Sequence, residues 1–419
     1  MGSVIVIGGG AAGMTAAIAA AMCGDRVTLL ERMDRVGKKI LATGNGRCNL
    51  MNTGELRYPG GTALAGEVLS RFGAKEQKRF WEHFGLRMRQ EDGGRVYPIS
   101  GAASTVLDTL RQALAALGTE TITGAHVDSI RRAKHGWTVT AGDSIYRGER
   151  VIVAGGGCAQ PKLGSDGSTY KLLQSLGHTM VRARPALTQI VTDTDPIRGL
   201  SGIRVRTKVT VTGEKQLKYA ESGELLFADY GVTGVCVMQC ARYVAPGDEL
   251  HIDLTRAMGF EDPAAFRNEL LRRNRLWQTS PCDRERISQR DMLTGLCLPK
   301  LAIALFRNAG IENAHEASAN GLSSSVIDRL VRQASDFRLL VKGVKGFESA
   351  QVTAGGIAAE EFDPATMASR IAPGIHAAGE VLDVDGDCGG YNLMFAFGSG
   401  ILAGLNGRRA PWEGSNREK

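Results

Sequence analysis

The sequence lacks the features that mark secreted and membrane proteins. No apolar stretch approaches the ~18 residues that a bilayer crossing requires, so we expect no transmembrane helix. The first predicted strand begins within a few residues of Met1, which leaves no room for a secretory signal peptide. We therefore expect a cytoplasmic protein that does not insert into membranes.

Cysteine pairs at metal-binding spacing are also missing. The eight cysteines are scattered and form no Cys-x-x-Cys pair, so neither a zinc site nor a disulfide framework is expected, and we assign no metal ligand. Cys236 and Cys240 lie on one predicted apolar helix, where small buried thiols are the favoured interpretation.

Positive charge is in modest excess, with a net charge of +7 that would favour anionic ligands. The densest basic region, 267–290, interleaves its arginines with acids, which is typical of a solvated helical face. No known nucleic-acid-binding module surrounds it, so nucleic acid is not an expected partner. The arginines concerned are Arg267, Arg272, Arg273, Arg275, Arg284, Arg286 and Arg290.

The start of the chain carries a dinucleotide-binding pattern. Residues 4–7 predict a buried parallel strand, and Gly8, Gly10 and Gly13 follow it as Gly-x-Gly-x-x-Gly. The first glycine allows the tight turn, the second lets the backbone approach a pyrophosphate, and the third lets helix and strand pack closely. The alanine-rich stretch 11–23 predicts the helix whose free N–H groups would face the phosphates.

An acid at the end of the second predicted strand completes this pattern. Glu31 follows strand 26–30. Its distance from the glycine motif is close to the ~20 residues at which a carboxylate accepts hydrogen bonds from the ribose. A carboxylate repels a 2′-phosphate, so the site should take the adenosine half of FAD or NAD and not NADP. The alternative is an ordinary strand–turn–helix without a ligand, but the strand, helix and acid together favour a nucleotide.

Length and composition changes predict an interrupted nucleotide-binding domain. A chain of 419 residues is too long for one compact core. Residues 34–52 read as a long functional loop, and 151–157 reads as a strand that ends in a glycine turn but starts no second nucleotide site. The expected division is 1–186 as the first nucleotide-binding part, 187–255 as a β-rich insertion, 256–336 as a helical insertion, and 337–419 as the second nucleotide-binding part.

The C-terminal segment 374–400 carries a second motif, which is rich in glycine and acidic residues. A short strand ends at Gly379 and Glu380, an acidic loop follows, and Gly389, Gly390 and Asn392 lead into the last predicted helix. The positive end of that helix suits the carbonyl edge of a flavin. A glycine-rich loop that caps a core helix, with Asn392 as the N-cap, is an equally open interpretation.

These motifs together resemble the BaiN/YhiN-like bacterial NAD(P)/FAD-dependent oxidoreductases, a family that includes aminoacetone oxidase-like flavoproteins. The resemblance extends over almost the whole chain. Its segments are GGGAAG with Glu31, GNGRCNLMN at 44–52, GRVYPIS at 94–100, GELLFADYGVTG at 223–234, AQVTAGG at 350–356 and AGEVLDVDGDCGGYN at 378–392.

The resemblance implies an α/β fold, with a Rossmann-like FAD-binding domain interrupted by a β-barrel-like domain and a small helical domain. It also implies contacts to FAD along its full length, with Val127 in a strand whose backbone meets the adenine. The implied cofactor-binding residues are Gly8, Gly10, Ala11, Ala12, Gly13, Glu31, Arg32, Lys38, Lys39, Gly44, Asn45, Gly46, Arg47, Cys48, Asn49, Val127, Ala154, Gly155, Gly379, Glu380, Asp387, Gly390, Asn392 and Leu393.

The expected activity is that of an FAD-dependent oxidoreductase. It would take a hydride from NAD(P)H, docked transiently, and reduce an activated double bond or carbonyl of a small organic substrate. The alternatives are an amine or aminoketone oxidase that uses oxygen, and a flavoprotein that acts on nucleic acid. Ala228 and Val235 depart from residues common in relatives, which leaves the substrate open. The catalytic residue and the oligomeric state are also open.

Cys48 and Cys388 raise a further hypothesis. Both lie in motifs that should converge on the cofactor, so they would form a redox-active pair if they came within disulfide range.

Overall fold

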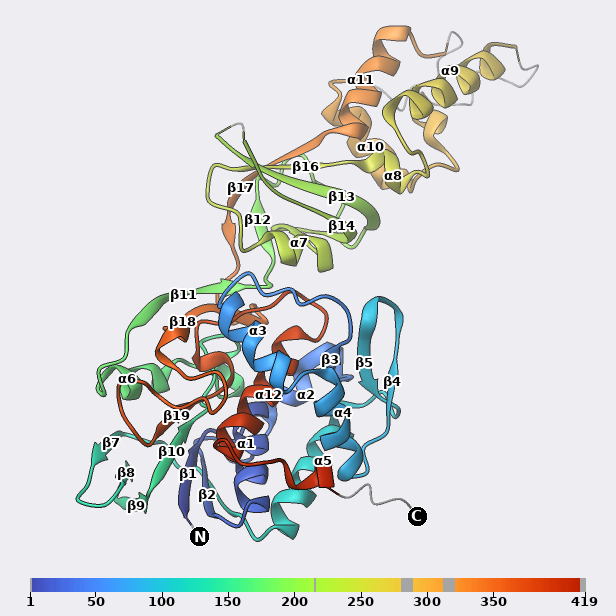
Figure 1. Ribbon diagram of the computed structural model, residues 1–419. Coiled ribbons are helices and arrows are strands. Elements are labelled where there is room, and N and C mark those ends of the chain that lie inside the picture. The colour runs from blue at the N-terminus through green and yellow to red at the C-terminus, as the bar shows by residue number, and fades with distance from the viewer. Residues whose placement is uncertain (1, 215, 280–288, 312–320, 415–419) are drawn as a thin grey trace, which may run out of the picture. The chain divides into compact units, whose positions relative to one another are not determined.

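The computed structural model describes residues 2–214, 216–279, 289–311 and 321–414, which form two compact units (Figure 1). Unit 1 combines Met1–Pro185 with Phe347–Lys419, and unit 2 is Ala186–Gly346. Unit 2 is therefore an insertion in the sequence of unit 1. None of the helices in the described ranges is both long enough and apolar enough to cross a membrane.

Unit 1 is built on a parallel five-stranded sheet in the order β19-β10-β1-β2-β6. Its central strands are almost fully buried apolar runs, as expected for a parallel sheet covered on both faces. Because all strands run the same way, their carboxyl ends share one edge. The strands are β1 (Ser3–Ile7), β2 (Arg26–Glu31), β6 (Glu120–Thr123), β10 (Arg150–Val153) and β19 (Ile375–Ala377).

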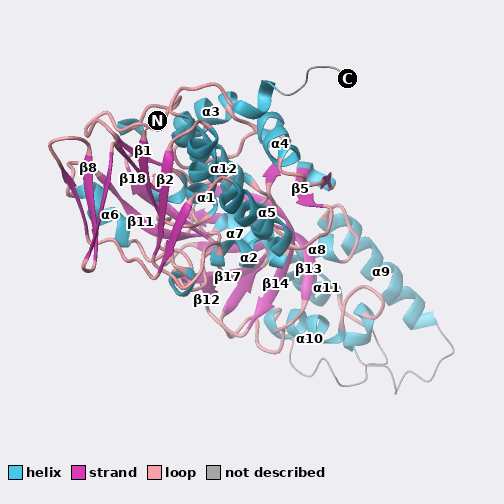
Figure 2. Ribbon diagram, turned by 90° about the horizontal axis from the view of Figure 1, so that it is seen from below, coloured by secondary structure: helices cyan, strands magenta, loops and turns pink. Residues whose placement is uncertain are grey.

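Helices α1, α5 and α12 lie together on one side of β1 and β2 (Figure 2). Two consecutive helices, α3 and α4, are separated by a break in the chain at Phe72 and Gly73. The expected loop 34–52 contains the short helix α2. The helices of unit 1 are α1 (Ala11–Met22), α2 (Lys38–Ala42), α3 (Thr62–Arg71), α4 (Ala74–His83), α5 (Ala103–Ala116), α6 (Ser168–Gln174) and α12 (Tyr391–Leu405).

Three smaller sheets complete unit 1: the antiparallel meander β7-β8-β9, the sheet β3-β5-β4 and the pair β11-β18. Strand β6 ends at Thr123, and the next strand, β7, begins only at Ser129. The additional strands are β3 (Met51–Asn52), β4 (Met88–Gln90), β5 (Arg95–Pro98), β7 (Ser129–Arg132), β8 (Trp137–Ala141), β9 (Ser144–Gly148), β11 (Met180–Ala186) and β18 (Val352–Ile357).

Unit 2 contains a closed six-stranded barrel in the order β12-β15-β14-β13-β16-β17. Alternate residues such as Val209 and Val211 fill its interior. The barrel includes β17, which the sequence analysis placed in the second nucleotide-binding part, because β17 pairs with β12 and β16. Its strands are β12 (Ile190–Thr192), β13 (Arg204–Gly213), β14 (Gln216–Ala228), β15 (Gly231–Thr233), β16 (Glu249–Ile252) and β17 (Phe337–Val344).

The remainder of unit 2 is helical. Cys236 and Cys240 are buried on α7, as expected. Asp253 and Ser323 cap α8 and α11 with their side chains. Residues 280–288, in the basic region 267–290, lie outside the described residues. The helices are α7 (Val235–Cys240), α8 (Leu254–Ala257), α9 (Pro263–Thr279), α10 (Pro299–Asn308) and α11 (Ser324–Ser335).

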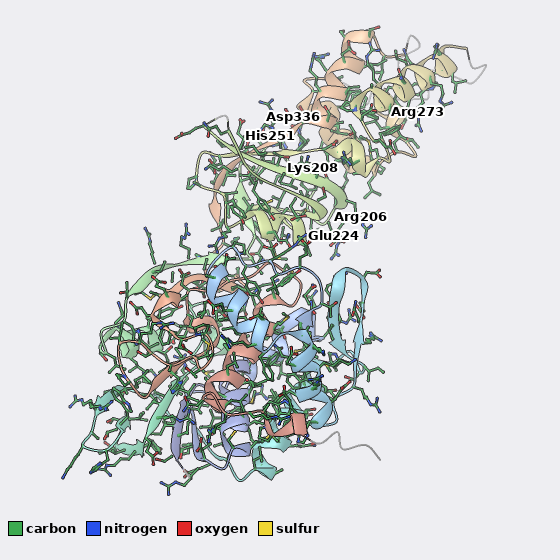
Figure 3. The ribbon with its side chains drawn as sticks, viewed as in Figure 1. Arg206, Lys208, Glu224, His251, Arg273 and Asp336 are labelled. Atoms are coloured by element: carbon green, nitrogen blue, oxygen red, sulfur yellow. The ribbon has the colours of Figure 1, made fainter. Side chains whose placement is uncertain are left out.

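Several charged side chains of unit 2 form ion pairs with one another. Arg272 and Arg273 both bind Glu269, which supports the interpretation of this region as a solvated helical face. On the barrel, His251 and Asp336 point toward each other, with 2.6 Å between Nδ1 and Oδ1 (Figure 3). Arg284 and Arg286 lie outside the described residues.

Candidate cofactor site

Two helix N-termini and the carboxyl edge of the parallel sheet face the same side of unit 1. A Cβ on Gly400 would overlap the carbonyl oxygen of Ala12, and one on Gly404 would overlap that of Ala16. The residue numbers of the two helices increase in the same direction along this contact, so α1 and α12 run parallel. Their partial positive ends therefore point the same way, toward the edge where β1 and β10 end.

The first glycine turn leaves open space in front of α1. A Cβ on Gly13 would overlap the carbonyl oxygen of Gly8, so this position requires glycine for close packing. A Cβ on Gly10 would instead meet no protein atom within 4 Å. Gly10 is the N-cap of α1 and offers no side chain to the free N–H groups of Ala11 and Ala12. An anion could bind these N–H groups, and the pyrophosphate contact of this turn stays a prediction.

Glu31 stands at the end of β2 with its carboxylate buried. It accepts hydrogen bonds from the Gly9 N–H (2.6 Å) and the Met33 N–H (2.7 Å), one on each oxygen. Each oxygen keeps a further lone pair for a ribose hydroxyl. Arg32 beside it pairs with Asp166.

Val127 is buried, but it is not in a strand as expected. It lies in the connection between β6 and β7, close in sequence to Ala125, whose N–H donates to the Glu31 carbonyl (2.9 Å). The chain turns here because β6 already ends at Thr123. Val127 therefore follows a segment that is tied to the end of β2.

The two lysines of α2 have different partners. Lys39 Nζ lies 2.7 Å from Glu380 Oε2, which brings together the N-terminal and C-terminal motifs. The other oxygen of Glu380 accepts the Thr353 N–H at 2.9 Å. Lys38 instead pairs with Asp34 one turn earlier, so its charge is already neutralised.

The second glycine turn, after β10, is filled by protein. A Cβ on Gly155 would overlap Thr169, and one on Gly157 would overlap Thr353. Ala154 continues the sheet, because its N–H donates to Ile7. This turn packs tightly where the first is open, which agrees with a single nucleotide site.

Thr353 is not among the cofactor-binding residues predicted from the sequence. Its hydroxyl accepts the N–H groups of Cys158 (2.8 Å) and Ala159 (3.0 Å), and its own N–H holds Glu380. The segment AQVTAGG was noted only as part of the resemblance. A threonine in a fully buried strand was the available signal, because its hydroxyl must find partners there.

The segment 43–49 is a tight turn. Gly44, Asn45, Gly46 and Cys48 all have positive φ angles between 55° and 81°. This strained backbone is typical of a functional site.

Arg47 holds the turn 43–49 to the sheet β3-β5-β4. Its guanidinium lies 4.1 Å from the centre of the Tyr97 ring and binds Glu91 at 2.5 Å. The hydrogen bond from Arg47 lowers the pKa of Glu91 below its usual value. The charge of Arg47 is therefore balanced before any ligand binds.

The N-terminus of α12 differs from the expectation in one detail. The helix begins at Tyr391 with Gly390 as its N-cap (φ 103°), so Asn392 is not the cap. The first intrahelical bond runs from the Met394 N–H to Gly390, which leaves the N–H groups of Asn392 and Leu393 ahead of it.

Two asparagines brace the loop before α12. Asn392 uses both ends of its amide on Gly386 (2.8 Å each way) and also donates to the Asp387 carbonyl at 3.3 Å. Asn52 donates to the Gly389 carbonyl at 2.9 Å. Gly379, at the other end of this motif, donates its N–H to Ser399 at 3.0 Å.

The cysteines of the two motifs are free thiols. Burial raises the pKa of Cys48 to about 12, and burial also raises the pKa of Cys388. Disulfide exchange needs a thiolate, which both sites disfavour at neutral pH. Among the described residues no group of His, Cys, Asp and Glu is arranged to hold a metal ion.

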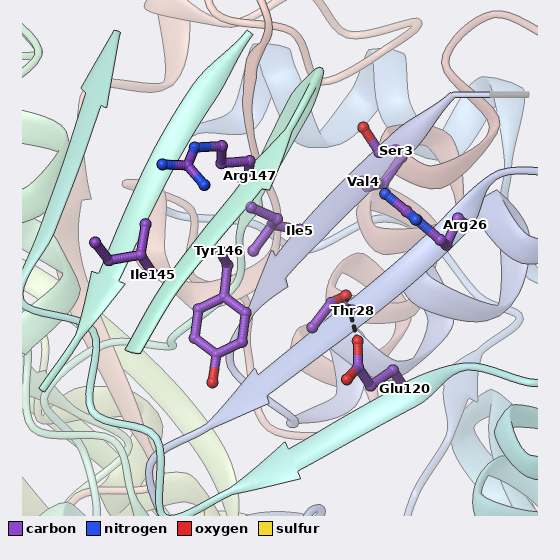
Figure 4. Close-up of a pocket in the computed structure, with 9 residues that line it drawn as sticks. All are labelled: Ser3, Val4, Ile5, Arg26, Thr28, Glu120, Ile145, Tyr146 and Arg147. Atoms are coloured by element: carbon purple, nitrogen blue, oxygen red, sulfur yellow. Dashed lines mark hydrogen bonds between the residues drawn. The ribbon is translucent and has the colours of Figure 1, made fainter. Parts of the chain in front are cut away.

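A separate cavity of about 270 Å³ lies at the opposite end of the parallel sheet (Figure 4). It is lined by the first residues of β1, β2 and β6 and by β9. Thr28 donates to Glu120 at 2.9 Å inside it. Because it lies at the amino ends of these strands, it is not part of the candidate cofactor site.

The chain matches the family described as HI0933-like protein Rossmann domain over residues 2–406. It belongs to this family. A 3-dehydro-bile acid delta(4,6)-reductase of Clostridium scindens is 35% identical over 98% of this chain and 100% of that protein. A ribosomal RNA dihydrouridine synthase of Escherichia coli is 27% identical over 94% of this chain and 95% of that protein.

Among solved structures, the 3-ketosteroid-delta4-(5alpha)-dehydrogenase of Rhodococcus jostii RHA1 has 15% identity and a TM-score of 0.47. The alignment covers 97% of this chain and 96% of that one.

The family assignment confirms the resemblance drawn from the motifs, and the chain is an FAD-dependent oxidoreductase. The fold is the expected one, an α/β Rossmann-like FAD-binding unit interrupted by a barrel and helices. The residues also fit the cofactor. Gly10 leaves a space that a Cβ would fill, and the side-chain oxygen of Asn49 is buried without a hydrogen-bond partner in the described structure.

Proposed function

We propose that this enzyme adds two hydrogens to a carbon–carbon double bond conjugated to a carbonyl, in a small and largely apolar molecule. The observation that carries the proposal is the 35% identity, over essentially full length, to a protein named as a bile acid delta(4,6)-reductase. Such a bond accepts a hydride at one carbon and a proton at the other.

FAD would lie along the carboxyl edge of unit 1, where it supplies hydride chemistry when bound. Glu31 would accept the ribose hydroxyls, and the N–H groups of Ala11 and Ala12 would bind the pyrophosphate. Lys39 would donate hydrogen bonds beside the phosphates, while its ion-pair partner Glu380 stays anchored by Thr353. The N-terminus of α12 would stabilise negative charge on a bound ring.

NAD(P)H is the proposed electron donor, bound transiently. A second glycine turn exists after β10, but Thr169 and Thr353 fill its space, so it offers no second nucleotide site. The net charge of +7 would draw a phosphorylated donor toward the protein.

The test is anaerobic reduction of the purified protein with NADH and NADPH in turn. We expect one donor to remove the oxidised-flavin absorbance, and a 3-oxo-4-ene steroid then to restore it while its mass rises by two hydrogens. An oxidised spectrum that persists with both donors would refute the proposed donor. Peroxide release from an amine substrate without NAD(P)H would support the oxidase alternative instead.

A second candidate substrate is uridine in RNA. Two relatives named as ribosomal RNA dihydrouridine synthases align over nearly the whole chain, at 27% and 26% identity, so the sequence-based expectation against nucleic acid is reopened. Dihydrouridine carries two hydrogens more than uridine, at a double bond conjugated to a carbonyl, so the chemistry would be the same. Dihydrouridine formed in added ribosomal RNA, with no reduction of the steroid, would select this candidate.

A further inference from the structure

The cavity at the amino ends of the parallel strands lies on one face of the sheet of unit 1 (Figure 4). In the strand register, Ser3 pairs with Arg26. Ile5 pairs with Thr28, and Thr28 pairs in turn with Glu120. Side chains at paired positions of neighbouring strands point to the same face of a sheet. The cavity is therefore a part of this face on which β2 and β6 carry polar side chains.

This face is open only toward the amino ends of the strands, although parallel sheets are normally covered on both faces. Leu30, on the same face near the carboxyl end of β2, is buried, whereas Arg26 and Glu120 are exposed. Strand β9 packs on the face, since a Cβ on Gly148 would lie 3.0 Å from Ile5 Cγ1. The opening thus has β9 on one side and β2 and β6 on the other.

Two guanidinium groups in the lining of this cavity have no partner in the protein. Arg26 on β2 and Arg147 on β9 make no side-chain hydrogen bond or ion pair within the residues that the structure describes. The one carboxylate of the lining belongs to Glu120, which already accepts the Thr28 hydroxyl at 2.9 Å. The cavity therefore carries an excess of positive charge, which favours an anionic ligand.

The two arginines belong to different walls of the cavity. Figure 4 shows Arg147 on the β9 side of Ile5 and Arg26 on the other side. Ile5 is apolar and 2% exposed, and it lines the cavity between them. A ligand that uses all three side chains carries an anionic group at each end of an apolar chain. The volume of about 270 Å³ is below the ~300–1,000 Å³ of sites for drug-sized ligands, so this chain is short.

We propose that this cavity binds a small aliphatic dicarboxylate, with one carboxylate on Arg26 and the other on Arg147. Guanidinium groups suit carboxylates because they donate two parallel hydrogen bonds to them. The site is separate from the candidate cofactor site, which lies at the carboxyl edge of the same sheet. The inference therefore does not depend on the proposed function.

The test measures the binding of glutarate and of butyrate to the FAD-loaded protein by calorimetry. Butyrate is glutarate with one carboxylate group removed, so it can engage only one arginine at a time. The wild type should bind glutarate about tenfold or more tightly than butyrate. In Arg26→Gln, and equally in Arg147→Gln, glutarate should bind no more tightly than butyrate, because only one guanidinium group is left.

Arg131→Gln is the matched control, because Arg131 is an exposed arginine on β7 that does not line the cavity. This variant should keep the preference for glutarate, and a loss of preference here would overturn the proposal, since the effect would then come from net charge. Equal affinity of the wild type for the two acids, or binding of neither, would also overturn it. A preference that survives in either cavity variant would do the same.

The flavin absorbance separates this site from the cofactor site. Glutarate should leave FAD bound, and release of FAD by glutarate would overturn the proposal, because the ligand would then occupy the cofactor site. If the protein holds no FAD, only the proposed cofactor site is refuted, since calorimetry measures the dicarboxylate directly. If one arginine variant does not fold, the wild type and the other variant still decide the question.

Discussion

Helices α1 and α12 run parallel, and their N-terminal and C-terminal ends differ in whether side chains of the protein bind them. At the N-terminal ends, Gly10 and Gly390 cap the helices without a side chain, and the space before Gly10 is open. At the C-terminal ends, two arginines of the protein bind the last carbonyls. Both ends carry a partial charge from the helix dipole, but protein side chains bind only the C-terminal ends, and we propose that a ligand binds the N-terminal ends.

We call the N-terminal ends of α1 and α12 the open end and their C-terminal ends the closed end. At the closed end lies Asp25, whose side chain is 6% exposed. Asp25 Oδ2 lies 2.8 Å from Arg150 and 2.5 Å from Arg408. Arg150 donates to the carbonyl of Ala403 at 3.2 Å, and Arg408 donates to that of Gly404 at 3.2 Å. One carboxylate thus holds two guanidinium groups against the negative ends of the helices.

The largest effect is expected at the closed end, from Asp25→Asn. Removing the negative charge leaves two cations close together, so the free energy of unfolding should fall by about 3 kcal/mol in denaturant titrations. FAD affinity of the folded fraction should not change. Asp108→Asn, at an exposed position of α5, is the control and should change stability by less than about 1 kcal/mol. If both variants destabilise equally, Asp25 has no special role.

Gly404→Ala should have the next largest effect. The added methyl group would overlap the carbonyl oxygen of Ala16 and push the two helices apart, at a cost of about 2 kcal/mol. Gly66→Ala on α3 adds the same group where no atom lies within 4 Å, and it should be neutral or slightly stabilising. Thermal unfolding of both apoproteins measures the difference, and equal midpoints would contradict close helix contact.

At the open end, Gly10→Ala should separate binding from stability. The backbone angles of Gly10 (φ −84°) suit any residue, and the added Cβ would meet no protein atom within 4 Å. The free energy of unfolding should therefore change by less than about 0.5 kcal/mol. The methyl group would nevertheless occupy the space in front of α1, and we expect FAD to bind at least about tenfold more weakly. Unchanged FAD affinity would mean that the phosphates lie elsewhere.

The smallest effect is the pH dependence at the closed end. Burial alone would raise the pKa of Asp25, but hydrogen bonds and charge from Arg408 and Arg150 outweigh burial and hold it below its usual value. The stability that the carboxylate contributes is therefore complete above about pH 4, its unfolded pKa, and is lost as the pH falls through the lower folded value. The stability difference between wild type and Asp25→Asn should be constant from pH 5 to 7 (roughly) and shrink below about pH 4. A difference that instead shrinks toward high pH would contradict this sign.

The sequence predicted the open end far better than the closed end. Gly8, Gly10, Gly13 and Glu31 lie close together along the chain, so their spacing alone describes a turn and its acid. Asp25, Arg150 and Arg408 come from three distant segments, and nothing in their local sequence indicates that they meet.

The details of the candidate site were predicted less well than its presence. Asn392 looked like an N-cap because asparagine before an apolar run is a common cap, but Gly390 takes that position and Asn392 braces the preceding loop. The orphan oxygen of Asn49 could not be predicted, since it depends on which donors the fold leaves out of reach.

The pairing of β11 with β18 has an evolutionary consequence. The chain leaves unit 1 at the end of β11 and returns shortly before β18, and these two strands are neighbours in one small sheet. A different inserted domain could therefore be placed between them without reordering β1, which leads into the Gly10 turn, or β2, which ends at Glu31. The inserted part could in this way be exchanged while the parallel sheet of unit 1 is inherited unaltered.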